Sequence, residues 1–178
     1  MKSTVVTKFR LICGDGWKNA MAGTISFSGI VVGGLVFGKL GDRVGRKNVF
    51  FLAIFQTVLC GLSAVFAENF TLYNVLTFLT SMGWLGVYET SFIMGIELVG
   101  PDKRVFCAIV IEFFWVLGEL LLAGLAWITR DHKYLTLSYL APFAIYLGLY
   151  HILPESLRWL IANKRFVEAE KMLQNIAK

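Results

Sequence analysis

The sequence predicts an all-α membrane protein with about five transmembrane helices, and two observations lead there. Of its 178 residues, 57% are hydrophobic and only 16% are charged, and the mean hydropathy is +0.67. Soluble domains are roughly 45–50% apolar and about 25% charged. The second observation is five long apolar stretches separated by short polar breaks. A buried helical core is the alternative, but five such stretches in so short a chain argue against it.

Each apolar stretch is about as long as a membrane crossing requires. A spanning helix needs about 20 apolar residues at a rise of about 1.5 Å per residue. Short connections between consecutive helices indicate antiparallel neighbours. The five predicted spans are Ala20–Phe37, Val49–Ala67, Leu72–Leu98, Val105–Ile128 and Leu135–Leu153.

The distribution of Lys and Arg predicts the orientation. Eleven of the 17 basic residues lie in the breaks of one side and in the carboxyl-terminal segment. Because cytoplasmic loops carry an excess of Lys and Arg, this side faces the cytoplasm, including the stretch Gly38–Phe50. Residues 1–18 then form the end of an extracellular loop, residues 19–153 the five-helix transmembrane region and residues 154–178 a cytoplasmic helical segment.

Two features of the predicted outer side concern modification. Cys13 would lie outside, where the redox conditions permit a disulfide. Asn69-Phe70-Thr71 is a formal N-glycosylation sequon. We expect Asn69 to be unmodified, because its loop is too short to leave the membrane surface.

Several functional classes find no support in the sequence. The net charge of +5 comes from short cationic clusters between apolar runs, so we expect no nucleic-acid partner. The three cysteines lie far apart, so a metal site is not expected. No nucleophile constellation or cofactor motif appears. We therefore expect a protein that is not an enzyme and has no cofactor, with sodium or proton coupling left open.

Three motifs lie in the predicted cytoplasmic breaks. In the first, glycines that permit a tight turn alternate with charged side chains that can pair. In the second, a proline ends the last span and Ser156 is placed to cap the helix that follows. The third begins with an acid at the end of a span. The motifs are Gly38-x-Leu40-Gly41-Asp42-Arg43-x-Gly45-Arg46-Lys47, Pro154-Glu155-Ser156-Leu157-Arg158-Trp159-Leu160 and Glu97-x-x-Gly100-x-x-x-Arg104.

These motifs resemble those of the major facilitator superfamily. The first is similar to its signature loop, G-x-L-x-D-R-x-G-R-K. The second is similar to the P-E-S-P-R-W-L motif of its sugar and organic-ion transporters, with Leu157 in place of a proline. Together they resemble the organic cation/carnitine transporter family, solute carrier family 22. The resemblance covers nearly the whole chain and matches spans two to six of twelve, so we expect a partial major facilitator bundle.

The resemblance implies a plasma-membrane transporter and a network of charges that closes its cytoplasmic side. Glu97 would pair with Arg46 or Arg104, and such pairs would break when the transporter opens. The residues expected in this cytoplasmic gate are Asp42, Arg43, Arg46, Glu97, Arg104, Glu155 and Arg158.

Acids inside the predicted spans are unusual, because an intramembrane charge is costly and marks a cavity or a partner. Glu89, Glu112 and Glu119 all lie in spans, and the last two share a helix face. Tyr88 and Phe92 are one helical turn apart, on a face that resembles the substrate-lining face of organic cation transporters. Aromatic rings beside carboxylates suit quaternary ammonium groups. Substrate-binding candidates are Tyr88, Phe92, Glu112 and Glu119.

The resulting functional hypothesis is transport of an organic cation or a zwitterion such as carnitine, by alternating access, as part of a larger transporter. The expected partners are that substrate, the lipid bilayer and the missing half or a full-length transporter. Two alternatives stay open. In the first, the chain is a truncated membrane protein that does not transport and instead binds or perturbs a full-length relative. In the second, it is a fragment of a sugar transporter, and the intramembrane acids argue against this alternative.

Following Trp159 the pattern predicts an amphipathic helix beneath the bundle. Phe166, Ala169, Leu173 and Ile176 recur at helical spacing, and basic residues flank them. The expected fold is therefore a partial transporter bundle with about five transmembrane helices and one cytoplasmic amphipathic helix.

Overall fold

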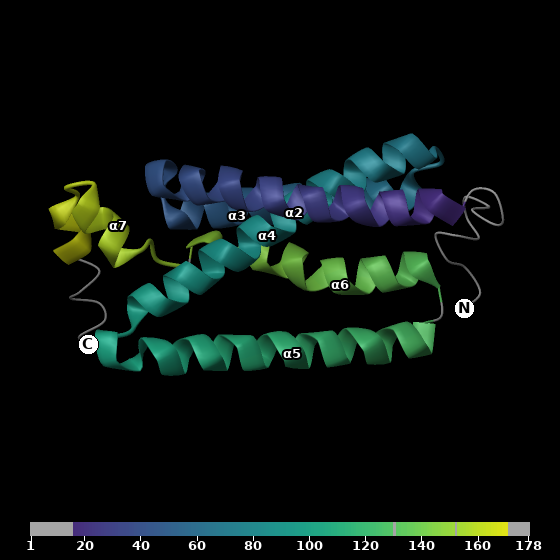
Figure 1. The fold of residues 1–178 in the computed structure, drawn as a ribbon. Helices are drawn as coiled ribbons and strands as arrows, with labels where there is room; N and C mark the ends of the chain where they lie inside the picture. The colour runs from purple at the N-terminus through teal and green to yellow at the C-terminus, as the bar shows by residue number, and fades with distance from the viewer. Residues whose placement is uncertain (1–15, 130, 152, 171–178) are drawn as a thin grey trace.

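The computed structural model describes residues 16–129, 131–151 and 153–170, and in these ranges the regular secondary structure is helical (Figure 1). This confirms the predicted all-α class. The α-helices are α2 (Gly16–Val44), α3 (Arg46–Phe66), α4 (Phe70–Leu98), α5 (Arg104–Thr129), α6 (His132–Leu147) and α7 (Leu157–Ala162), with short 3₁₀ helices η2 (Pro101–Lys103) and η3 (Gly148–His151). Cys13 and most of the predicted extracellular segment, residues 1–15, lie outside the described residues.

Helices α2, α3, α4 and α5 are each long and apolar enough to cross a membrane. The fifth predicted span is organised differently, because α6 has only 16 residues and continues into η3. Pro142 lies inside α6, where it lacks the N–H that a regular helix uses. The break at Gly148 therefore replaces the uninterrupted span that hydropathy alone predicts.

The charged stretch after the first span is helical, contrary to the loop expected there. Helix α2 continues through Asp42 to Val44, and α3 begins at Arg46. Only Gly45, with φ of 110°, turns the chain. This is a backbone conformation that glycine adopts at little cost. Gly41, expected to help form the turn, is instead a buried helical residue of α2.

Helix α4 packs most extensively against α2 and α3. The contact with α2 is backbone on backbone, since Gly29 lies against the carbonyl of Phe78 and Gly33 against that of Met82. Small residues four apart permit such an approach in membrane helices. On the other side, Gly83 of α4 faces the α3 backbone at Ala53.

Helix α5 is the least enclosed of the long helices. None of its residues is buried, and large side chains such as Phe113, Leu121 and Trp127 are more than 60% exposed. Figure 1 shows α5 as a long rod at the edge of the bundle, joined to the end of α4. An apolar surface of this size suits lipid or another protein rather than water.

Helix α7 lies at the end of the bundle where α2 ends and α3 begins, called the α7 end below (Figure 1). Ser156 is its N-cap and accepts a hydrogen bond from the Trp159 N–H, as the sequence predicted. The helical pattern expected after it is present over residues 166–170. Leu173 and Ile176 lie outside the described residues.

Candidate functional site

Two groups of side chains carry the chemistry of the described structure. The first, called the α7-end network, consists of Asp42, Arg46, Glu97, Glu155, Ser156 and Trp159. The second, called the α4–α5 cluster, consists of Trp84, Tyr88, Phe92, Glu112, Trp115 and Glu119.

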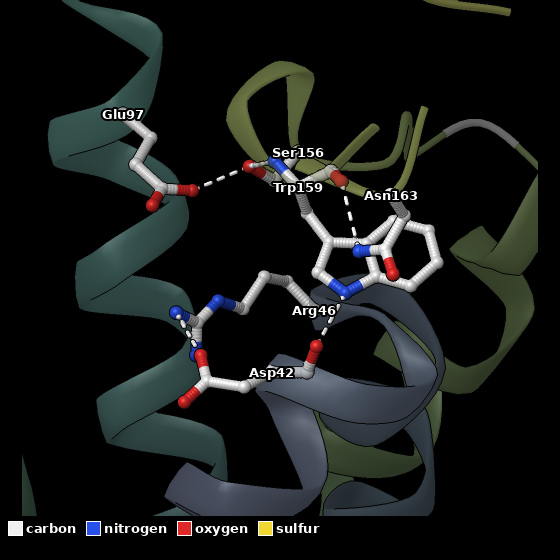
Figure 2. Close-up of polar contacts among 6 residues, drawn as sticks. All are labelled: Asp42, Arg46, Glu97, Ser156, Trp159 and Asn163. Carbon is white, nitrogen blue, oxygen red and sulfur yellow. Dashed lines mark hydrogen bonds and ion pairs between the residues drawn. The ribbon is translucent and has the colours of Figure 1, made fainter. Parts of the chain in front are cut away.

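Within the α7-end network, Asp42 and Arg46 form an ion pair across the turn at Gly45. Arg46 Nη2 lies 2.8 Å from Asp42 Oδ1, with the Arg46 side chain 14% exposed and that of Asp42 69% exposed (Figure 2). Trp159 of α7 donates from its indole Nε1 to the main-chain carbonyl of Asp42 at 2.9 Å. The last turn of α2 is therefore held both to the start of α3 and to α7.

Glu155 stabilises the beginning of α3. Its Oε1 accepts the Lys47 N–H at 2.9 Å and the Ser156 N–H at 3.0 Å. The first N–H groups of a helix have no partner inside the helix, and this end carries a partial positive charge. A carboxylate placed there supplies both an acceptor and the favourable charge. The sequence predicted Glu155 in ionic contacts, and the structure assigns it to backbone N–H groups.

Glu97 connects α4 to the same segment. Its Oε2 accepts a hydrogen bond from Ser156 Oγ (Figure 2). The expected ion pair of Glu97 with Arg46 or Arg104 is absent from the part of the chain that the structure describes. Arg46 is turned toward Asp42, and Arg104 has an exposed side chain at the start of α5.

The other predicted gate residues lie at the periphery of the α7-end network. Arg43 and Arg158 have exposed side chains. A cavity of about 250 Å³ lies between α4 and residues 153–157, and Glu97, Glu155 and Ser156 contribute to its wall. The network therefore joins four chain segments around a space that is not filled by the described side chains.

The α4–α5 cluster brings three of the four predicted substrate residues into contact. Tyr88 donates its hydroxyl hydrogen to Glu112 Oε1 of α5. The Tyr88 ring stacks on Phe92, with centroids 6.1 Å apart. Glu119 takes part through Trp115, whose Nε1 donates to Glu119 Oε1 at 3.2 Å.

Two tryptophans complete this cluster, and the sequence interpretation missed both. Trp115 meets Trp84 and Tyr88 edge to face, with centroids 5.0 and 4.9 Å apart. Trp84 lies one turn before Tyr88 on α4 and stacks on it at 6.5 Å. The spacing was available as a signal, because Trp84, Tyr88 and Phe92 follow one another every four residues. Similarly, Trp115 lies between the two acids of α5.

The chemistry of the α4–α5 cluster favours a cation. Aromatic faces attract ammonium groups, most strongly when water is excluded. Two carboxylates provide the complementary charge, and they repel an anion. Glu112 and Glu119 have exposed side chains in the described structure, so a ligand can reach them from the open side of α4 and α5.

Comparisons with known proteins agree with this architecture. Residues 18–178 match the family model of sugar (and other) transporters. The chain is 34% identical to organic cation/carnitine transporter 2 of Homo sapiens over 177 residues, which is 99% of this chain and 32% of that protein. It is equally identical to organic anion transporter 3 of Mus musculus, covering 99% of this chain and 33% of the relative. The chain thus spans about a third of the length of these curated relatives.

The fold is shared with a solved transporter structure. The inward-open conformation of the xylose transporter XylE from E. coli superimposes with a TM-score of 0.77 at 19% identity, covering 92% of this chain and 43% of that one. The chain therefore has the fold of part of a major facilitator bundle.

Proposed function

The chain belongs to the sugar (and other) transporter family, and we propose that it forms part of a plasma-membrane transporter for organic cations or zwitterions such as carnitine. The α7 end faces the cytoplasm in this proposal, because the breaks on that side carry most of the Lys and Arg residues. The substrate binds near the middle of the membrane, against α4 and α5.

The observation that carries the proposal is the contact of Tyr88 with Glu112 among the rings of Trp84, Phe92 and Trp115. A quaternary ammonium group fits against the ring faces, while the carboxylates balance its charge. Relatives include proteins named for cations and for anions. The two acids favour the cation, because they would leave an anionic ligand facing like charges.

The α7-end network supplies the second part of the mechanism. Alternating access requires one side of the binding site to close while the other opens. One ion pair and two hydrogen bonds link α2, α3, α4 and the α7 segment at one end of the bundle. They are Asp42–Arg46, Glu97–Ser156 and Trp159–Asp42. These contacts stabilise a closed cytoplasmic side, and their separation accompanies opening.

Binding to the full chain tests the substrate class. The chain is reconstituted in lipid nanodiscs, and tetraethylammonium and benzoate are titrated calorimetrically. We expect tetraethylammonium to bind and benzoate not to bind, and we expect Glu112→Gln to lower the tetraethylammonium affinity about tenfold, since a close cation contact is worth on the order of 1–2 kcal/mol. Glu68→Gln is the matched control, since this acid is exposed and lies between α3 and α4. Tighter binding of benzoate would contradict the proposal.

Uptake into vesicles separates the two functional alternatives. Accumulation of labelled carnitine or tetraethylammonium above the level of empty vesicles means that this chain transports by itself. The bare apolar face of α5 favours the second alternative, in which the chain associates with a full-length relative. Co-purification with such a relative, without uptake by the chain alone, is the result expected from that alternative.

A further inference from the structure

Glu89 is an intramembrane acid that neither of the two residue groups uses. It follows Tyr88 on α4 but points toward α2 instead of α5. Its Oε1 lies 3.1 Å from the position that a Cβ would take on Gly38, and its Oε2 is 3.8 Å from the corresponding position on Gly34. The absence of side chains at these two glycines makes room for the carboxyl group.

The carboxyl group of Glu89 is not satisfied in the described structure. Its Oε2 is buried and has no hydrogen-bond partner. Burial of an unpartnered carboxyl oxygen is costly, and such groups in membrane helices mark a partner or a pathway.

Arg46 of α3 also packs against a glycine of α2. Arg46 Nη1 is 3.0 Å from the Cβ position of Gly41. Gly38 and Gly41 are three residues apart on α2, so their Cβ positions are about 5–6 Å apart on one face. The guanidinium and the Glu89 carboxyl group therefore occupy adjacent places over two glycines of the same helix.

Arg46 is paired with an acid that is much more exposed than Arg46 itself. Its side chain is 14% exposed, yet its partner Asp42 is 69% exposed and partly hydrated. The more enclosed acid, Glu89, has an oxygen without a hydrogen-bond partner and lies against Gly38, one helical turn before Asp42 on α2. Exposed ion pairs contribute little to stability, whereas an unpartnered buried group is expensive.

We infer that Glu89 is a second acceptor for the Arg46 guanidinium, which moves one turn along α2 from Asp42 to Glu89. In the first position Arg46 holds α3 to the end of α2. In the second it holds α3 to α4, directly beside the residue whose hydroxyl contacts Glu112. The role of this exchange in transport rests on the proposed function, since it would connect the α4–α5 cluster to the α7-end network; the pairing itself does not.

A double-mutant comparison of unfolding tests the inference without any organic cation. The full chain is unfolded with dodecyl sulfate in mixed micelles, and helix loss is followed by circular dichroism. In the wild-type background Glu89→Gln leaves the folded-to-unfolded ratio unchanged or raises it, because Glu89 is unpaired there. In the Asp42→Asn background Arg46 turns to Glu89, and Glu89→Gln lowers the ratio about fivefold or more. This loss disappears when Arg46→Gln is added.

Each contrary outcome is decisive. Equal effects of Glu89→Gln in both backgrounds overturn the inference, as does failure of Asp42→Asn to fold, since Glu89 is then no substitute acceptor. A loss that persists with Arg46→Gln assigns Glu89 a different partner. Glu68→Gln is the control and has the same effect in every background. Failure of the chain to bind tetraethylammonium would contradict the proposed function and leave this result unchanged.

Discussion

The two sides of α4 are built differently. Toward α2 and α3, the helices meet through glycines that allow backbone atoms to touch, as at Gly33 and Gly83. Toward α5, the contact is made by large aromatic and acidic side chains with exposed surface, such as Tyr88 and Glu112. The first side is packed backbone against backbone at these glycines. The second presents polar and aromatic groups whose positions depend on one another, which is what a binding site requires.

Adding one methyl group at Gly33 is the largest expected disturbance of the tightly packed side. In Gly33→Ala the new Cβ would lie 2.9 Å from Met82 Cα and still closer to the Met82 carbonyl oxygen. Main-chain atoms cannot move aside as a flexible side chain does, so the helices must separate. We expect the free energy of unfolding to fall by about 2–3 kcal/mol, measured by dodecyl sulfate titration in micelles.

Gly124→Ala on α5 is the matched control for this prediction. A Cβ at Gly124 meets nothing within 4 Å, and alanine has the higher helix propensity. The free energy of unfolding should therefore stay constant or rise slightly. Equal losses for Gly33→Ala and Gly124→Ala would show that the close approach of α2 and α4 at Gly33 is not what makes an added methyl group costly.

Removing the hydroxyl group of Ser156 tests how firmly the α7 segment holds the packed side. Ser156 Oγ caps α7 by accepting the Trp159 N–H and also donates to Glu97. Loss of an N-cap costs about 1 kcal/mol, and a hydrogen bond to a charged group contributes about 1.5 kcal/mol. We expect Ser156→Ala to lower the free energy of unfolding by about 2 kcal/mol in the same titration.

Ser63→Ala provides the comparison for Ser156. Ser63 is exposed on α3 and its hydroxyl donates only to the Leu59 carbonyl of its own helix. Its removal should change the unfolding free energy by less than about 0.5 kcal/mol. A similar small change for Ser156→Ala would mean that α7 is not attached to the bundle through this residue.

Much of this fold was predictable because hydropathy and helix periodicity are local properties of the sequence. Four predicted spans correspond to helices that are long and apolar enough to cross a membrane, and the cap at Ser156 is confirmed. The end of α2 was not predicted, because the segment from Lys39 to Val44 remains helical despite its charged residues, and only Gly45 turns the chain. The charged residues there show where the apolar stretch of the sequence ends, but the helix continues beyond that point.

The partners of individual side chains were harder to predict than the helices. Glu97 and Arg46 were expected to form a pair, but Arg46 pairs with Asp42 four residues before it, and Glu97 contacts Ser156, a partner that depends on how the α7 segment folds against α4. Spacing along one helix cannot reveal such contacts. The place of Trp115 between two acids was visible in the sequence, but its contacts with the rings of Trp84 and Tyr88 on α4 were not. Contacts between side chains of different helices can be identified only from the tertiary structure, whereas residues that repeat along one helix can be identified from the sequence.

The loosely packed side should respond to mutation through binding more than through stability, and Trp115→Leu tests this. Leucine keeps an apolar side chain on α5 but removes the ring that meets Trp84 and Tyr88 and the indole that donates to Glu119. A single cation–π contact is worth about 0.5–1 kcal/mol at an exposed site. We therefore expect the affinity for tetraethylammonium in nanodiscs to fall about threefold to fivefold, with an unfolding free energy within about 1 kcal/mol of wild type.

Trp127→Leu is the control, since that ring is 75% exposed on the same helix, and it should leave both quantities unchanged. If Trp115→Leu instead destabilises the protein by more than Ser156→Ala while binding is retained, the contact between α4 and α5 is a packing interface like the one between α4 and α2.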